Sequence, residues 1–92
     1  MTPIDAVALQ LEELIFEIID KCALLKNIGI QQGTDVYSEI FDNFMAIHMV
    51  DNMAIITIGA PEEFTIQEIR DTISYYEGIK LELDIMLELS SL

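Results

Sequence analysis

The sequence predicts an α+β fold in which two long helices flank a short β-hairpin, in the order α-ββ-α. Three observations predict it. Apolar residues recur at helical spacing near the N-terminus, two apolar runs flank a turn in the middle, and a capping motif opens another helical segment near position 65. A chain of 92 residues without an internal repeat or linker has the length of one domain. We therefore expect residues 1–92 to form a single domain.

The first predicted helix begins at Pro3 and ends between Asn27 and Gly29. Thr2 is a suitable N-cap, and a proline at the first helical position gives up no hydrogen bond. A glycine readily takes the left-handed conformation that ends many helices. The apolar residues between these two ends recur every three or four positions: Val7, Leu11, Leu14, Ile15, Ile18, Cys22 and Leu25.

The middle of the chain has two interpretations. The Asp-Asn pair at 51–52 suits a two-residue turn, and the apolar runs on either side of it, 44–50 and 53–58, predict the strands of a hairpin. A competing helical spacing predicts a helix over 35–49, or over the first part of that range to about Asn43. Both interpretations remain open at this stage.

A second long helix is predicted to begin at Ile66. Thr65 and Glu68 fit the capping box, in which each residue satisfies a backbone amide of the other. Phe64 and Ile69 occupy the two positions of the hydrophobic staple that often accompanies this motif.

The end of this segment is ambiguous. Over residues 79–89 apolar and polar side chains alternate, which is the period of a strand. The same residues are largely Leu, Glu, Lys and Met, which favour a helix. We favour one continuous helix to about Leu89 with a weak point at Gly78. The alternatives are a strand over 79–89, giving α-ββ-α-β, and an all-α chain.

Charge and apolarity are both high in this chain. It has 17 Asp and Glu against 4 Lys and Arg, a net charge of −13, and 52% hydrophobic residues. Its field repels anions, which argues against direct binding of nucleic acid or of an anionic membrane surface. No apolar run approaches the roughly 20 residues that span a bilayer. A small domain with this much apolar surface is expected to cover some of it by association, so we predict a homodimer or a protein partner.

The residue types that carry most catalytic chemistry are scarce. Cys22 is the only cysteine and lies on the apolar stripe of the first helix, where a thiol is inert, and His48 is the only histidine. Zinc and calcium ligand patterns and a phosphate-binding glycine loop are absent. We therefore predict no enzyme activity, no metal site and no cofactor. Since no disulfide can form within the chain and no basic residue precedes Lys21, we expect a cytoplasmic protein.

Acidic residues on the two long helices form the predicted partner-binding face: Glu13, Glu17, Asp20, Glu77, Asp84 and Glu88. Carboxylates three or four positions apart form a row along a helix, as phosphates do along a nucleic acid. Lys21 is the cation placed to pair with Glu17. A solvated face is the ordinary interpretation of such a row. The large net charge favours a functional role, because self-repulsion destabilises a compact domain.

These features lead to a hypothesis of a non-enzymatic inhibitor that docks its acidic face on a basic surface of a partner. The partner would be a nucleic-acid enzyme if the row mimics nucleic acid. One alternative is a small acidic dimeric chaperone or secretion adaptor that holds a client through exposed methionines, Met45, Met49, Met53 and Met86. Another is an immunity protein that neutralises a toxin.

Overall fold

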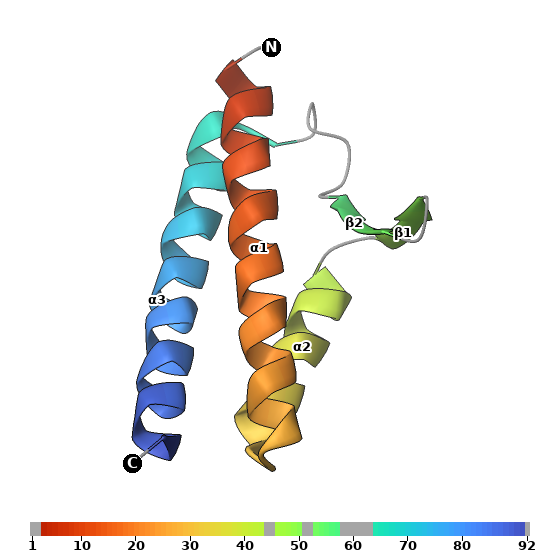
Figure 1. The fold of residues 1–92 in the computed structure, drawn as a ribbon. Coiled ribbons are helices and arrows are strands. Elements are labelled where there is room, and N and C mark those ends of the chain that lie inside the picture. Colours follow the sequence, from red (N-terminus) through yellow and green to blue (C-terminus); the bar gives the residue numbers. More distant parts are fainter. Residues whose placement is uncertain (1–2, 44–45, 51–52, 58–63, 92) are drawn as a thin grey trace.

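The computed structural model describes residues 3–43, 46–50, 53–57 and 64–91 (Figure 1). The chain forms a long helix, a shorter helix, a pair of strands and a second long helix. In order, these elements are α1 (Pro3–Asn27), α2 (Gln31–Asn43), β1 (Ala46–Val50), β2 (Met53–Thr57) and α3 (Ile66–Ser90).

Three helices build this fold, and the predicted α+β class is wrong. Buried apolar residues of α1, α2 and α3 form one cluster. Strands β1 and β2 run antiparallel, with Val50 opposite Met53, and they form no larger sheet among the described residues. Two strands alone cannot supply a layer against which helices bury their apolar faces. The helices therefore pack on one another, and the all-α alternative describes the core.

The first predicted helix is confirmed as α1. Six of the seven residues in its predicted apolar stripe are buried, and Leu14 packs at the edge of the core. The helix ends in the arrangement known as a Schellman motif: Gly29 has a φ of 80°, its amide donates to the Lys26 carbonyl, and the Ile30 amide donates to the Leu25 carbonyl over 3.0 Å. The predicted N-cap, Thr2, lies outside the described residues.

The chain turns back directly into α2, which lies close against α1. A glycine makes this approach feasible. A Cβ atom at Gly33 would lie 2.7 Å from the carbonyl oxygen of Cys22 and 2.9 Å from the Cβ of Leu25. The competing interpretation of the middle of the chain predicted a helix from 35 to about Asn43, and α2 covers that range but begins four residues earlier, at Gln31.

The second long helix, α3, begins as predicted. The hydroxyl of Thr65 accepts from the Glu68 amide over 3.1 Å, and the Thr65 amide donates to the Glu68 carboxylate over 3.3 Å. The helix continues through Gly78 to Ser90, so the alternative of a strand over 79–89 is wrong. The good helix formers in that range outweigh its alternating pattern.

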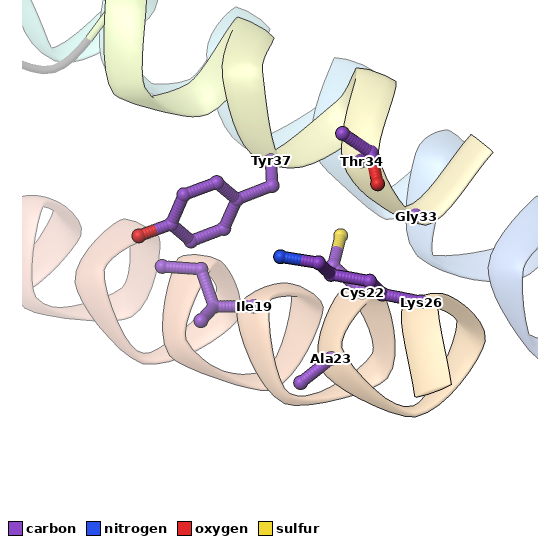
Figure 2. A pocket seen from close by; sticks show the side chains of 7 residues that line it. All are labelled: Ile19, Cys22, Ala23, Lys26, Gly33, Thr34 and Tyr37. Atoms are coloured by element: carbon purple, nitrogen blue, oxygen red, sulfur yellow. The ribbon is translucent and has the colours of Figure 1, made fainter. Parts of the chain in front are cut away.

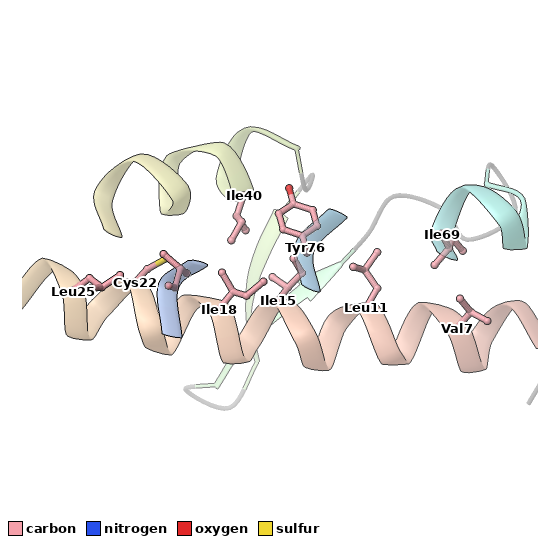
Figure 3. Close-up of a cluster of buried hydrophobic side chains, with 10 residues drawn as sticks. Val7, Leu11, Ile15, Ile18, Cys22, Leu25, Ile40, Ile69 and Tyr76 are labelled. Carbon is pink, nitrogen blue, oxygen red and sulfur yellow. The ribbon is translucent and has the colours of Figure 1, made fainter. Parts of the chain in front are cut away.

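The two long helices run side by side in the same direction, and α2 runs back along α1 (Figure 1). Ile69, Tyr76 and Leu83 of α3 recur every seven residues and are buried in the helical core. Figure 3 shows Tyr76 of α3 beside Ile40 of α2 and next to Ile15 of α1. One apolar core therefore joins all three helices, and α1 contributes most of it.

Candidate partner-binding surface

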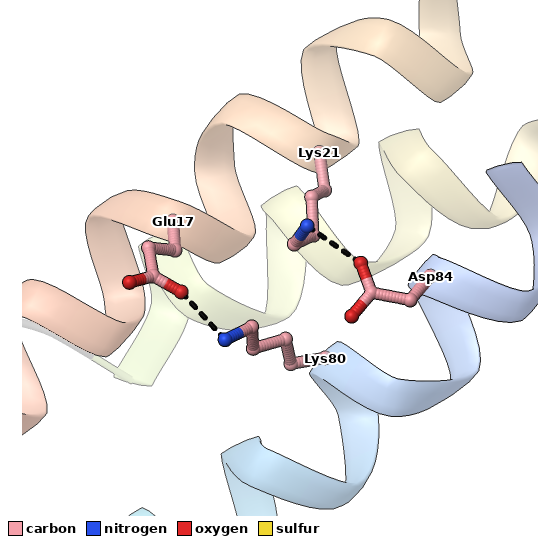
Figure 4. Close-up of polar contacts among 4 residues, drawn as sticks. All are labelled: Glu17, Lys21, Lys80 and Asp84. Carbon is pink, nitrogen blue, oxygen red and sulfur yellow. Dashed lines mark ion pairs between the residues drawn. The ribbon is translucent and has the colours of Figure 1, made fainter.

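The six residues of the predicted acidic face do not form an uninterrupted row of charges. Glu17 Oε2 lies 2.7 Å from Lys80 Nζ, and Asp84 Oδ1 lies 2.5 Å from Lys21 Nζ (Figure 4). Lys21 therefore forms its ion pair across to α3 and not, as predicted, with Glu17 of its own helix. Alongside Lys80, the charge of Lys21 still helps to lower the pKa of Glu17. Both ion pairs join residues 63 positions apart, so together they mark the parallel register of α1 and α3.

The ion pairs also change the titration of their members. A hydrogen bond and charge attraction from Lys80 hold the pKa of Glu17 below its ordinary value, and Glu17 in turn raises the pKa of Lys80. The seam between the two long helices is thereby locally neutral. Glu13 and Glu17, four positions apart on α1, repel each other, and the Lys80 cation from the neighbouring helix offsets this repulsion.

The other four residues of the acidic face are exposed, and no ion pair among the described residues reaches them: Glu13, Asp20, Glu77 and Glu88. Two of the four cations of the chain are held in the seam. Of the remaining two, Lys26 lines a pocket between α1 and α2, and Arg70 lies near the beginning of α3. Little positive charge is therefore available to balance the acidic surface.

A second surface, which the sequence analysis missed, lies on α3. Leu81, Ile85 and Leu89 are exposed by 62, 47 and 63% of their surface, whereas Leu83 is 1% exposed. We call these three exposed residues the outer stripe. Their spacing of four places them on one side of the helix, turned away from the buried position of Leu83.

The sequence contained the signal for this surface. The alternation over 79–89 suggested a strand, but in a helix it distributes apolar residues over opposite sides. Ile79, Leu83 and Leu87 face the core or its edge, and the other half of the alternating set remains outside. Once the segment is known to be helical, the spacing of four between Leu81, Ile85 and Leu89 identifies the outer stripe.

Acidic residues border the outer stripe on both sides. Glu77 and Glu88 lie three or four positions from stripe residues along one flank, and Glu82 lies along the other. All three carboxylates are exposed. Glu77 and Glu88 of the acidic face thus neighbour the outer stripe on α3.

A pocket of about 250 Å³ lies between α1 and α2 (Figure 2). Its lining residues are Ile19, Cys22, Ala23, Lys26, Gly33, Thr34 and Tyr37. Burial raises the pKa of the Cys22 thiol, which favours the unreactive protonated form. The Lys26 ammonium is the one charged group in the lining, so the pocket combines no acid with a base.

The other residues singled out in the sequence are four methionines and His48. The side chains of Met45, Met49, Met53 and His48 lie outside the described residues, and Met86 packs against the core. The methionine surface of the chaperone alternative therefore stays a prediction. In the part of the chain that the structure describes, no three His, Cys, Asp or Glu side chains gather to hold a metal ion.

Comparison with known proteins found no match, whether with family models, with curated proteins or with solved structures. Function is therefore inferred from the surface of the molecule itself. Within the described ranges, none of the helices combines the length and the apolar run that crossing a membrane requires.

Proposed function

We propose that this protein is a non-enzymatic binding protein that docks an acidic surface on a basic surface of a protein partner and thereby inhibits it. The observation that carries the proposal is the placement of charge. The chain has a net charge of −13, and the two ion pairs engage only Glu17 and Asp84 of the acidic face. Four exposed carboxylates remain for a partner.

Such a surface steers a basic partner electrostatically and competes with other anions for it. A nucleic-acid enzyme is the class of partner with a suitable basic surface, because it must neutralise phosphates. The ion pairs at Glu17 and Asp84 interrupt the row that would imitate a phosphate backbone. Any mimicry therefore depends on Glu13, Asp20, Glu77 and Glu88.

The outer stripe favours a second candidate function, that of an acidic chaperone or adaptor. Exposed apolar residues that lie together on a helix are typical of a protein-binding face. The two functions differ in their response to salt, since contacts between charges are screened and apolar contacts are not.

The proposal is tested by capturing partners on the immobilised chain at low salt and purifying the proteins that salt elutes. Binding of each purified partner is then measured by calorimetry at about 50 and about 500 mM NaCl. We expect Kd to rise at least about tenfold over this range. An unchanged Kd would contradict the proposal and favour the chaperone or adaptor.

Two double variants locate the interaction on the surface. Glu77→Gln with Glu88→Gln removes two charges from the acidic face, and Asp35→Asn with Asp42→Asn removes two exposed charges from α2. We expect the first pair to weaken binding about tenfold and the second to weaken it less than about twofold. Equal losses would show a response to net charge alone and would contradict the assignment of the face.

A further inference from the structure

The outer face of α3 has a continuous surface that the fold does not use. Ser74 and Gly78 precede the outer stripe at spacings of four and three, so they lie on the same side of the helix as Leu81, Ile85 and Leu89. Both residues are exposed. The face therefore changes along its length from small residues to large apolar ones.

Gly78 has no explanation within the described part of the chain. A glycine inside a helix is less stable than an alanine, and helices keep one where a backbone or a ligand must approach closely. Nothing lies within 4 Å of the position that a Cβ atom at Gly78 would occupy. Gly33, by contrast, is required by the close contact of α2 with α1. The space above Gly78 is therefore open to another molecule.

Two occupants could cover this apolar face, namely a second copy of this chain or a basic segment of another protein. The charges around the face distinguish them. In a second copy of this chain, Glu77, Glu82 and Glu88 would meet the same carboxylates of the first copy. Three of the four cations of the chain lie away from this face: Lys21 and Lys80 are in the seam ion pairs, and Lys26 is in the α1–α2 pocket. Arg70, four positions before Ser74, is the one cation left beside the face, against three carboxylates on each copy. Like charges facing each other across an interface oppose association.

We propose that the outer face of α3 binds a basic amphipathic helix of a partner protein. Apolar side chains of that helix, three or four positions apart, would cover Leu81, Ile85 and Leu89. Its flanking Lys and Arg residues would meet Glu82 on one side and Glu77 and Glu88 on the other. A small residue opposite Gly78 would let the two helices approach closely. This inference rests on the proposed function, because it names the segment of the basic partner that docks.

The test uses a synthetic 18-residue peptide of Leu, Lys, Arg and Ala with leucines at helical spacing and basic flanks. A peptide of the same composition with the leucines scrambled is the control for charge alone. Fluorescence anisotropy measures Kd with the full chain. We expect the amphipathic peptide to bind at least about tenfold more tightly than the scrambled one. Equal affinities would overturn the inference.

Variants of the full chain identify the face. Leu81→Gln with Ile85→Gln is expected to weaken binding of the amphipathic peptide at least about tenfold. Leu24→Gln with Ile28→Gln, at the end of α1 and similarly exposed at 55 and 53%, should change it less than about twofold. Gly78→Ala is expected to weaken binding about threefold or more while leaving the helix content by circular dichroism intact.

The outcomes separate this inference from the proposed function. Binding of the purified partner is measured for both double variants. If Glu77→Gln with Glu88→Gln weakens it while Leu81→Gln with Ile85→Gln does not, the inference is wrong and the acidic docking surface stands. If neither double variant weakens it, the inference and the proposed function are both wrong. A dimer in sedimentation experiments that the Leu81→Gln and Ile85→Gln variant abolishes would assign the face to a second copy and overturn the basic helix.

Discussion

Glu12 of α1 is a carboxyl group whose surroundings oppose its charge. Its side chain is half-buried, and burial raises the pKa above the ordinary value of 4.5. An acid with a raised pKa in the folded state favours folding while it is protonated. Stability then falls as the pH rises from below 4.5 through the raised pKa. The pH dependence that Glu17 gives to stability has the opposite sign, because Lys80 lowers the pKa of Glu17. The contribution of Glu17 to stability is lost as the pH falls through that lowered pKa.

Replacing Glu12 by Gln is therefore expected to stabilise the protein at pH 7, since the amide has no charge to bury. The gain should disappear at about pH 3, where the carboxyl is protonated in both states. Thermal unfolding followed by circular dichroism at the two pH values measures it. Glu13→Gln is the matched control, because it removes the same charge from an exposed neighbour. Equal gains in Tm for both variants at pH 7 would mean that general charge repulsion, and not burial, is responsible.

At the scale of the elements, the two helical glycines have opposite environments. Gly33 lies where α2 meets α1, and an added methyl group there would collide with the Cys22 carbonyl at 2.7 Å. That oxygen belongs to the backbone of α1, so the helices would have to separate. Gly78 is exposed in the middle of α3, and an added methyl group there would meet nothing.

The same substitution should therefore have opposite effects at the two positions. Gly33→Ala is expected to lower the free energy of unfolding by about 1–3 kcal/mol, the usual range for overpacking. Gly78→Ala is expected to raise it by about 0.5–1 kcal/mol through helix propensity. Urea unfolding followed by circular dichroism measures both, each serving as the control for the other. Stabilisation by Gly33→Ala would contradict the close contact between α1 and α2.

The helices that the sequence predicted well are those whose ends carry local chemistry. The capping box at Thr65 and the glycine end of α1 depend on residues only a few positions apart, so the sequence displays them directly. The continuity of α3 was harder to predict, because an alternating pattern competes with helix propensity. Propensity prevailed there once Leu83 and its neighbours could pack against α1.

The arrangement of the elements, and with it the fold class, was beyond local signals. Nothing in the sequence around Glu17 or Lys21 indicates that their partners lie 63 positions away on a parallel helix. The acidic residues could be named, but the neutral seam that divides them required the packing of α1 on α3. The outer stripe likewise became visible only when the side of α3 that packs against α1 was known.

At the scale of the whole molecule, the net charge of −13 acts against folding, and two ion pairs act for it. The ion pairs lie at the surface, where each such pair contributes about 0–1 kcal/mol. The uncompensated carboxylates repel one another at all distances within the screening length, which is about 10 Å at 0.1 M salt. The repulsion involves many more groups than the two ion pairs, so we expect it to dominate the change of folding stability with salt.

We therefore expect Tm to rise when NaCl is increased from about 20 to about 500 mM, while binding to a basic partner weakens over the same range. Sodium chloride is preferable to sulfate, which strengthens apolar burial by itself. Replacing Lys21 and Lys80 by Gln removes both ion pairs and two positive charges, so the rise in Tm with salt should be steeper in that variant. A Tm that falls with salt in the unaltered chain, but not in this variant, would show that the seam ion pairs outweigh the repulsion. The acidic surface would then cost the fold little stability, and self-repulsion would give no reason to infer that function maintains the net charge.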